Sequence, residues 1–351
     1  MRTLSEAHAR AAVDGGVPGP EPVTDGLWSL PIPMPGGHLA YTLSAVHVGE
    51  VGGVTVVDPG WDTPAAVERL DALLAKLGRR IADVATIIVT HAHPDHVGAA
   101  PRLRAASGAR LLMHEHEQSG IDRERADLGI GAGRDGQPGQ LDHRMATWGV
   151  PGSDVERVAE LTAESRADFI PAEPADALLR DGDRVPIPGL DWRVLATPGH
   201  TAGHICLVDD ARRLILTGDH VIPHVFPGIG LGAGGGGPHP VEDALASLAR
   251  LAPYDEYDVL PGHGYRFHGL REWRAEMTAH ILRRAREVAA AIAADPAATV
   301  WEVASRLTWS AGWARLSQGP MLPSALMQTE MHVDFVRAGG LQRWAAELPE
   351  A

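Results

Sequence analysis

The stretch "VTHAHPDHVGAA", residues 89–100, places four metal-binding residue types within six positions: His91, His93, Asp95 and His96. In an extended chain, side chains two residues apart point the same way, so His91 and His93 can hold one metal ion. Asp95 and His96 follow where the chain turns, and they can face a second ion. Neutral imidazole and carboxylate are good zinc ligands, which favours a metal site over a chance cluster.

Three further candidate ligands follow predicted strands later in the chain. His200 in "TPGHTAGH" comes after the predicted strand 193–197, Asp219 in "ILTGDH" after 213–217, and His263 in "VLPGHG" after 257–260. In layered α/β proteins, functional loops gather beyond one end of a sheet, so these side chains can converge with the first four. Glycine or proline flanks each candidate, which suits tight turns and a close approach of the backbone to an ion.

The composition is that of a globular protein, because 44% of the 351 residues are hydrophobic and 22% are charged. The length allows one large domain with an appendage, or two domains. The N-terminus has no apolar run, and no apolar stretch approaches the length of a membrane span, so we expect a cytoplasmic protein. A formal net charge of −14 weighs against a polyanionic partner such as RNA and favours a small substrate.

The order of predicted elements divides the chain into segments. Residues 1–24 form a polar lead-in, and residues 25–270 carry the motifs on alternating strands and helices. Within them, residues 120–180 are predicted to be an insertion over one edge of the core that acts as a lid. Residues 271–351 are predicted to be helical, with Thr299 and Glu302 spaced as a capping box. The glycine run 234–237 is predicted to be mobile.

The motifs "THAHPDH", "TPGHTAGH", "TGDH" and "PGHG", in that order, resemble the signature of the metallo-β-lactamase fold superfamily of hydrolases over residues 25–270. The resemblance implies an αββα sandwich with the site at the edge where its two sheets meet. It implies one metal ion on His91, His93 and His200. It implies a second ion on Asp95, His96 and His263, with Asp219 bridging the two.

Two further parts of the sequence resemble this superfamily. Asp58 in "VVDPG" matches a family aspartate that supports the site by accepting a proton from a ligand imidazole. The stretches "TVWEVASRL" and "MQTEMHVDFVRAGGL" resemble the winged-helix-like tail of the glyoxalase-II-like and lactamase-β-like branch. The resemblance therefore implies a small helical, winged-helix-like C-terminal domain, whose helices are candidate surfaces for a homodimer.

A dinuclear centre of this kind indicates metal-dependent hydrolysis. Two metal ions that share a water would lower its pKa, and the resulting hydroxide would attack a carbonyl. Asp95 and Asp219 are the candidate catalytic residues: Asp95 would orient the water or carry its proton, and Asp219 would join the metals. We expect two zinc ions, with iron or manganese as alternatives. His93 favours zinc hydrolysis, since flavodiiron relatives are expected to carry a carboxylate at that place.

The best candidate substrate is a small ester or thioester of the acyl-CoA or glutathione type. The alternatives are an endoribonuclease or phosphodiesterase that uses the same site, and a lactonase or β-lactamase. A non-catalytic binding module is disfavoured because all seven candidate ligands are present. The candidate pocket residues are His220, His224, Phe226, Tyr265 and Arg266.

For several of these residues a simpler role is equally open. Arg266 could bind an acidic group or form a surface ion pair. Trp148 and Phe226 could form an apolar wall for an acyl group, or pack in the core. His204 in "TAGH" is predicted to form a local hydrogen bond and not to bind metal.

Overall fold

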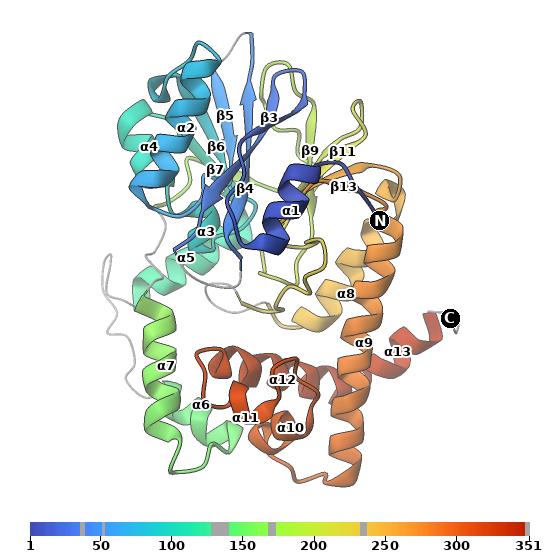
Figure 1. The fold of residues 1–351 in the computed structure, drawn as a ribbon. Coiled ribbons are helices and arrows are strands. Elements are labelled where there is room, and N and C mark those ends of the chain that lie inside the picture. The colour runs from blue at the N-terminus through green and yellow to red at the C-terminus, as the bar shows by residue number, and fades with distance from the viewer. Residues whose placement is uncertain (36–38, 51–52, 128–139, 168–172, 232–236, 348–351) are drawn as a thin grey trace.

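The computed structural model of the chain describes residues 1–35, 39–50, 53–127, 140–167, 173–231 and 237–347. Two β-sheets pack face to face, and helices cover both outer faces (Figure 1). Apolar residues of both sheets, among them Leu43, Val57 and Leu216, fill the space between them. This αββα arrangement confirms the predicted fold.

In the described part of the chain, the first sheet has seven strands in the order β2-β3-β4-β5-β6-β7-β8. Strands β5 to β8 are parallel, so their carboxyl ends lie along one edge. The bounds are β2 Glu21–Thr24, β3 Leu27–Pro33, β4 Tyr41–Val48, β5 Val54–Val57, β6 Val84–Ile88, β7 Arg110–His114 and β8 Ala177–Leu179.

The described part of the second sheet has six strands in the order β1-β13-β12-β11-β10-β9. Its central strands β11 and β12 are parallel and also end at the same edge. The bounds are β1 Arg2–Thr3, β9 Trp192–Ala196, β10 Ile205–Asp209, β11 Leu214–Gly218, β12 Asp258–Pro261 and β13 Phe267–His268. Residues 1–24, expected to precede the domain, supply β1 and β2 to the two sheets and carry helix α1 (Glu6–Asp14) between them.

Helices close the sandwich on each side (Figure 1). On the first sheet, α2 and α4 bury an apolar stripe that includes Leu70, Leu74 and Leu103. On the second sheet, α8 and the long α9 bury Leu245, Leu248 and others. The bounds are α2 Pro64–Lys76, α3 Pro94–Val97, α4 Ala100–Ser107, α8 Pro240–Arg250 and α9 Leu270–Ala294, with 3-10 turns η1 Ile81–Asp83 and η2 Ala252–Tyr254.

A layer of helices lies below the sandwich in Figure 1 and combines two distant parts of the sequence. Helices α6 and α7 of the predicted insertion pack against α10 and α12 of the C-terminal region. Trp148 is 2% exposed in this contact, so it packs between helices and offers no wall to a substrate. The bounds are α5 Glu115–Asp127, α6 Gln140–Trp148, α7 Val155–Ala167, α10 Val300–Arg306, α11 Trp313–Leu316, α12 Leu322–Arg337 and α13 Gly340–Glu347.

The C-terminal region is helical, as predicted. The capping box at α10 is confirmed: Thr299 N donates to Glu302 at 2.8 Å, and Glu302 N donates to the Thr299 hydroxyl at 3.2 Å. In residues 271–347 the structure has no strand, so the tail lacks the β-hairpin wing that a winged helix carries. None of the helices in the described ranges combines the length and hydrophobicity needed to span a bilayer. Most of the predicted mobile glycine run falls on residues 232–236, outside the described residues.

The packing of Trp148 predicts how firmly the two helical segments are joined. Replacing a buried tryptophan by alanine leaves a cavity and costs about 3–5 kcal/mol. We therefore expect Trp148→Ala to lower the free energy of unfolding by about that amount in urea titrations followed by circular dichroism. Trp148→Phe keeps most of the apolar volume and should cost much less. Equal unfolding midpoints for the unaltered chain and Trp148→Ala would contradict this packing.

Candidate metal centre

The seven predicted ligands meet at one edge of the sandwich. His91 and His93 follow β6, His200 follows β9, and Asp219 and His263 follow the parallel pair β11 and β12. The two sheets are joined at this edge, because Leu43 N donates to Gly262 O at 2.6 Å and Ile205 N donates to Thr90 O at 3.0 Å. The carboxyl ends of strands from both sheets therefore deliver their loops to one place.

The first cluster consists of His91, His93, His200 and Asp219. His93 Nδ1 lies 2.9 Å from His91 Nε2 and 3.1 Å from His200 Nε2. Asp219 Oδ2 lies 3.7 Å from His200 Nε2 and 4.0 Å from His91 Nε2. One atom of each side chain therefore points to a common centre.

The second cluster consists of Asp95, His96, His263 and Asp219. The Nε2 atoms of His96 and His263 are 3.2 Å apart, and Asp95 Oδ2 lies 3.1 Å from His263 Nε2. Asp219 Oδ1 lies 3.3 Å from each of the two imidazole nitrogens. The two carboxylate oxygens of Asp219 thus face different clusters.

The donor atoms of both clusters fit a metal ion. A tetrahedral ion with bonds of about 2.1 Å holds its ligands roughly 3.4 Å apart, and the atoms of each cluster lie within 4.8 Å of one another. Imidazole nitrogens 2.9–3.2 Å apart repel each other unless a proton or a cation lies between them. In addition, Asp219 Oδ1 is buried without a hydrogen bond of good geometry, although two imidazole nitrogens lie 3.3 Å from it. A buried carboxylate oxygen of this kind is explained by a bound cation.

The outward nitrogen of each ligand imidazole contacts an oxygen. Three imidazoles donate a hydrogen bond to a backbone carbonyl. His93 Nε2 donates to Leu231 O at 2.9 Å, His200 Nδ1 to Gly228 O at 2.7 Å, and His263 Nδ1 to Tyr41 O at 2.8 Å. These contacts place the proton on the outward nitrogen and aim the lone pair of the other nitrogen at the centre.

Asp58 supports the remaining two imidazoles. Its Oδ2 lies 3.0 Å from His96 Nδ1 and accepts from the Thr90 hydroxyl at 2.7 Å, and that hydroxyl lies 3.1 Å from His91 Nδ1. Its Oδ1 accepts from Thr90 N at 2.7 Å. Asp58 has a left-handed backbone with φ of 51°, a strained conformation that is concentrated at functional sites. These contacts are those that the family resemblance implied for this aspartate.

His204 and Gly262 shape the surroundings of Asp219. His204 forms the predicted local bonds: its Nε2 accepts from Asp219 N at 3.1 Å, and its Nδ1 lies 2.9 Å from the Thr197 hydroxyl. A Cβ at Gly262 would lie 2.5 Å from Asp219 Oδ1 and 2.9 Å from His96 Cε1. Only glycine fits there, so the glycine of "PGHG" admits the carboxylate to the centre.

Charges differ between the two clusters. In the first, burial and the neighbouring imidazoles hold the pKa of His91 well below its usual value and lower the pKa of His200 to about 4. In the second, burial opposes a charge on His263, but Asp219 and Asp95 outweigh it and raise its pKa to about 10. Burial likewise opposes charge on Asp219, yet His263 and His96 hold its pKa well below the usual value. His91 and His200 of the first cluster are therefore neutral imidazoles, whereas the second cluster is an array of ion pairs.

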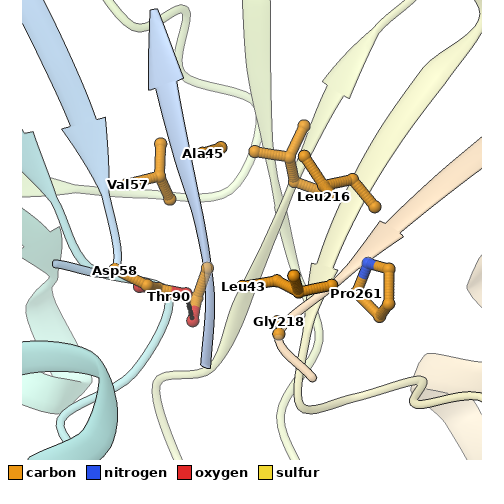
Figure 2. Close-up of a pocket in the computed structure, with 10 residues that line it drawn as sticks. Leu43, Ala45, Val57, Asp58, Thr90, Leu216, Gly218 and Pro261 are labelled. Carbon is orange, nitrogen blue, oxygen red and sulfur yellow. Dashed lines mark hydrogen bonds between the residues drawn. The ribbon is translucent and has the colours of Figure 1, made fainter. Parts of the chain in front are cut away.

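The floor of the site is apolar. Figure 2 shows a small cavity between the sheets, with Asp58 and Thr90 at its lower end and Val57, Ala45 and Leu216 above them. Its volume of about 10 Å³ is at the lower limit of what one water needs. The apolar side chains beside Asp58 and Thr90 lower the local polarity, which strengthens the electrostatic interactions of the charges at the site.

Two of the predicted pocket residues line a groove. His224 and Tyr265 border a space of about 450 Å³ together with Trp273, Glu272 and Glu276 of α9. The rings of His224 and Trp273 are 5.6 Å apart, and those of His224 and Tyr265 are 6.2 Å apart. This groove has an aromatic base and an acidic rim.

The other three predicted pocket residues lie differently. Phe226 is 38% exposed and stacks on Trp273 and His280. His220 is only 4% exposed, and its ring lies 6.0 Å from that of His204. Arg266 donates to Pro22 O and forms an ion pair with Glu21 at 3.5 Å. Of the two roles considered for Arg266, this contact corresponds to the ion pair and not to binding of an acidic substrate group.

Glu117 is a buried residue beside the site that was not among the predicted site residues. This side chain is 4% exposed and contacts both loops that supply the first cluster. It stands in "HEHEQ", where nothing distinguishes it from the neighbouring Glu115 except burial. The backbone carbonyls that accept hydrogen bonds from the ligand imidazoles could not be predicted either, because every residue type has such a carbonyl.

Comparison with known proteins agrees with this geometry. The sequence model of the metallo-beta-lactamase superfamily matches residues 41–263, more than half of the chain. A probable metallo-hydrolase of Bacillus subtilis is 27% identical over 62% of this chain and 66% of its own length. A hydroxyacylglutathione hydrolase of Pseudomonas putida is 29% identical over 66% of each chain. The match therefore spans just under two thirds of the length of these relatives.

Solved structures extend the likeness beyond the matched region. A metallo-beta-lactamase family protein from Thermus thermophilus superposes with a TM-score of 0.70 and 28% identity over 91% of this chain and 95% of its own. A beta-lactamase domain protein from Burkholderia ambifaria superposes with a TM-score of 0.70 over 93% of this chain and 90% of its own. At 24% identity, this second likeness concerns the fold alone.

The charges of the second cluster predict proton release on metal binding. At pH 8 the metal-free chain holds a proton on His263, whose pKa is raised to about 10, and the pKa of His96 is raised as well, whereas the pKa values of His91 and His200 are lowered. Filling both clusters with Zn²⁺ should release about one proton or more per chain at pH 8, because a ligand nitrogen must give up its proton. The release should fall as the pH rises through about 10, where His263 loses its proton unaided.

Calorimetric titration with Zn²⁺ in two buffers of different ionisation enthalpy measures this release. The observed heat should depend on the buffer at pH 8. Identical heats in the two buffers would contradict the charge distribution described for the second cluster.

Proposed function

Since the chain belongs to the metallo-beta-lactamase superfamily, we propose that it is a dinuclear metal-dependent hydrolase acting on a small ester or thioester. The observation that carries the proposal is the position of Asp219. Its two carboxylate oxygens face two clusters, and each cluster offers three further ligand atoms. This arrangement suits a pair of ions held side by side.

The proposed cofactor is two zinc ions. His91, His93 and His200 would hold one, Asp95, His96 and His263 would hold the other, and Asp219 would join them. Nitrogen and oxygen donors without thiolate suit Zn²⁺, and iron and manganese are the alternatives. When bound, such ions supply Lewis acidity, which activates water and polarises the oxygen of an acyl group.

Asp95 is the residue proposed to move protons. Its side chain is 13% exposed, whereas His96 is 0% and His263 is 1% exposed, so it is the second-cluster ligand that a substrate reaches most easily. Asp95 would accept a proton from the attacking water and return it to the leaving oxygen or sulfur as the acyl bond breaks. Asp58 and the three backbone carbonyls would keep the imidazoles oriented meanwhile.

The surroundings of the site favour an acyl compound over a polyanion. Phe226 begins an aromatic surface that continues through Trp273 to His224 and Tyr265, and it suits an apolar acyl group. Phe226 is two residues from Gly228, whose carbonyl contacts His200, so this surface starts near the first cluster. The similarity to hydroxyacylglutathione hydrolases supports a thioester among acyl compounds.

Phosphodiester hydrolysis is the weaker alternative. Of the two glutamates on the rim, Glu272 pairs with the N-terminal amine at 3.2 Å, whereas Glu276 would repel nucleic acid phosphates. In the basic stretch at the middle of α9, Arg284 pairs with Glu287 and Arg283 donates to His280 Nδ1, so two of its arginines are bonded within the helix. We therefore propose a small-molecule substrate and no nucleic-acid partner.

The remaining expectations from the sequence stay proposals. They are a catalytic domain over residues 25–270 with a lid-like insertion over 120–180, a C-terminal domain over 271–351, a homodimer through its helices, and a cytoplasmic location. Helices α6 and α7 pack on the C-terminal helices, which supports treating the insertion and the tail as one helical layer.

The proposal predicts which substrates the protein hydrolyses. The metal-loaded chain should hydrolyse p-nitrophenyl esters and thioesters of coenzyme A or glutathione. Asp219→Ala should lower kcat/KM by about 100-fold or more and reduce bound metal to at most one ion per chain, because one side chain serves both clusters. Asp210→Ala is the control, an aspartate that is 53% exposed outside the site.

Two outcomes would contradict the proposal. One is metal content and turnover that survive Asp219→Ala, which would remove the dinuclear assignment. The other is RNA cleavage that falls steeply with salt while esters and thioesters stay intact, which would favour the nuclease.

A further inference from the structure

We propose that Glu117 is a positioning residue that sets the geometry of the first cluster by holding its two loops together. The inference rests on the metal centre proposed above. It adds a residue that neither binds the ions nor touches a ligand imidazole.

Glu117 occupies the first turn of α5, directly after β7, and is 4% exposed. Its Oε2 accepts from Ala92 N at 2.8 Å. Ala92 is the residue between His91 and His93, so this bond fixes the backbone that carries two of the three histidines. The extended backbone of this pair is what lets both imidazoles face one ion.

The other oxygen of the same carboxylate holds the loop of the third histidine. Glu117 Oε1 accepts from the Thr201 hydroxyl at 2.6 Å and from Gly203 N at 2.8 Å. Thr201 follows His200 directly, and a Cβ at Gly203 would lie 2.4 Å from Glu117 N. Glycine at 203 therefore allows the loop to approach α5 closely.

The two loops come from different sheets. Residues 91–93 follow β6 of the first sheet, and residues 200–203 follow β9 of the second. A shift of either sheet against the other would separate His200 from His91 and His93. One buried carboxylate with three donors resists that shift, and the dry surroundings strengthen each bond.

The described hydrogen bonds of Glu117 support the loops of the first cluster and not those of His96 and His263. Among its hydrogen-bond partners in the described chain, Glu117 has no residue adjacent to His96 or His263, whose support comes from Asp58 and Tyr41. Loss of Glu117 should therefore weaken metal binding at the first cluster more than at the second.

Glu117→Gln tests the role with little change in size. A glutamine amide has one acceptor oxygen and one donor nitrogen. In either orientation of the amide, its NH₂ group would face the N–H of Ala92 or of Gly203, and one hydrogen bond would be lost. Titration of the full chain with Co²⁺ against a competing chelator, followed by the visible spectrum, reports affinity and ligand geometry. We expect the apparent Kd of one of the two ions to rise about 10- to 100-fold, with the other ion nearly unchanged.

Glu115→Gln is the matched control, because Glu115 lies in the same turn and pairs with the exposed Arg180. Thr201→Val removes one of the three donors and should weaken the same ion less strongly, whereas Thr201→Ser keeps the hydroxyl and should restore the affinity. If Glu117→Gln does not fold, the comparison of Thr201→Val with Thr201→Ser tests the positioning role instead.

Three results separate the hypotheses. If the unaltered chain binds no Co²⁺, the metal centre itself is wrong. If it binds two ions and Glu117→Gln and Thr201→Val match Glu115→Gln in affinity and spectrum, the positioning role is overturned. If these two variants lower only the melting temperature of the metal-free chain, Glu117 serves the fold and the inference also fails.

Discussion

The burial of one carboxylate between four imidazoles is the constraint that the rest of this structure serves. Asp219 lies within 4.0 Å of His91, His96, His200 and His263, and its buried Oδ1 forms no hydrogen bond of good geometry. So many ionisable groups cannot share a dry site unless protons or cations lie between them. The fold meets this requirement by bringing strand-end loops of both sheets to one edge, where a pair of metal ions can replace the protons.

Backbone carbonyls and other side chains both orient the ligand imidazoles, through hydrogen bonds to the ring nitrogens that face away from the metal centre. Carbonyls of Tyr41, Gly228 and Leu231 orient three imidazoles, and Asp58 orients His96 directly and His91 through Thr90. Gly228 belongs to a segment that also contacts α12, since Ile229 N donates to Gln328 Oε1 at 3.4 Å. The helical layer thus reaches the site through the loop that supports His200, so distant packing can influence metal geometry.

The sequence predicted the fold and the convergence of the seven candidate ligands because these signals are local. Strand-end motifs such as "ILTGDH" combine a buried strand, a glycine turn and a ligand within six residues, and four of them in order match one superfamily. The residues that line the substrate pocket could not be predicted from local motifs. His220 and Arg266 are polar residues close to ligands in sequence, yet one is packed inside and the other pairs with Glu21. Glu117 escaped notice because its partners at 92, 201 and 203 are distant in sequence, and only the closed sandwich brings them together.

The central claim is that this edge of the sandwich holds two metal ions that share Asp219. Anomalous diffraction from crystals grown with Zn²⁺, recorded on both sides of the zinc absorption edge, tests it most directly. The account predicts two anomalous peaks per chain, one among His91, His93 and His200 and the other among Asp95, His96 and His263, with Asp219 between them. A single peak, or peaks away from these side chains, would contradict the dinuclear centre.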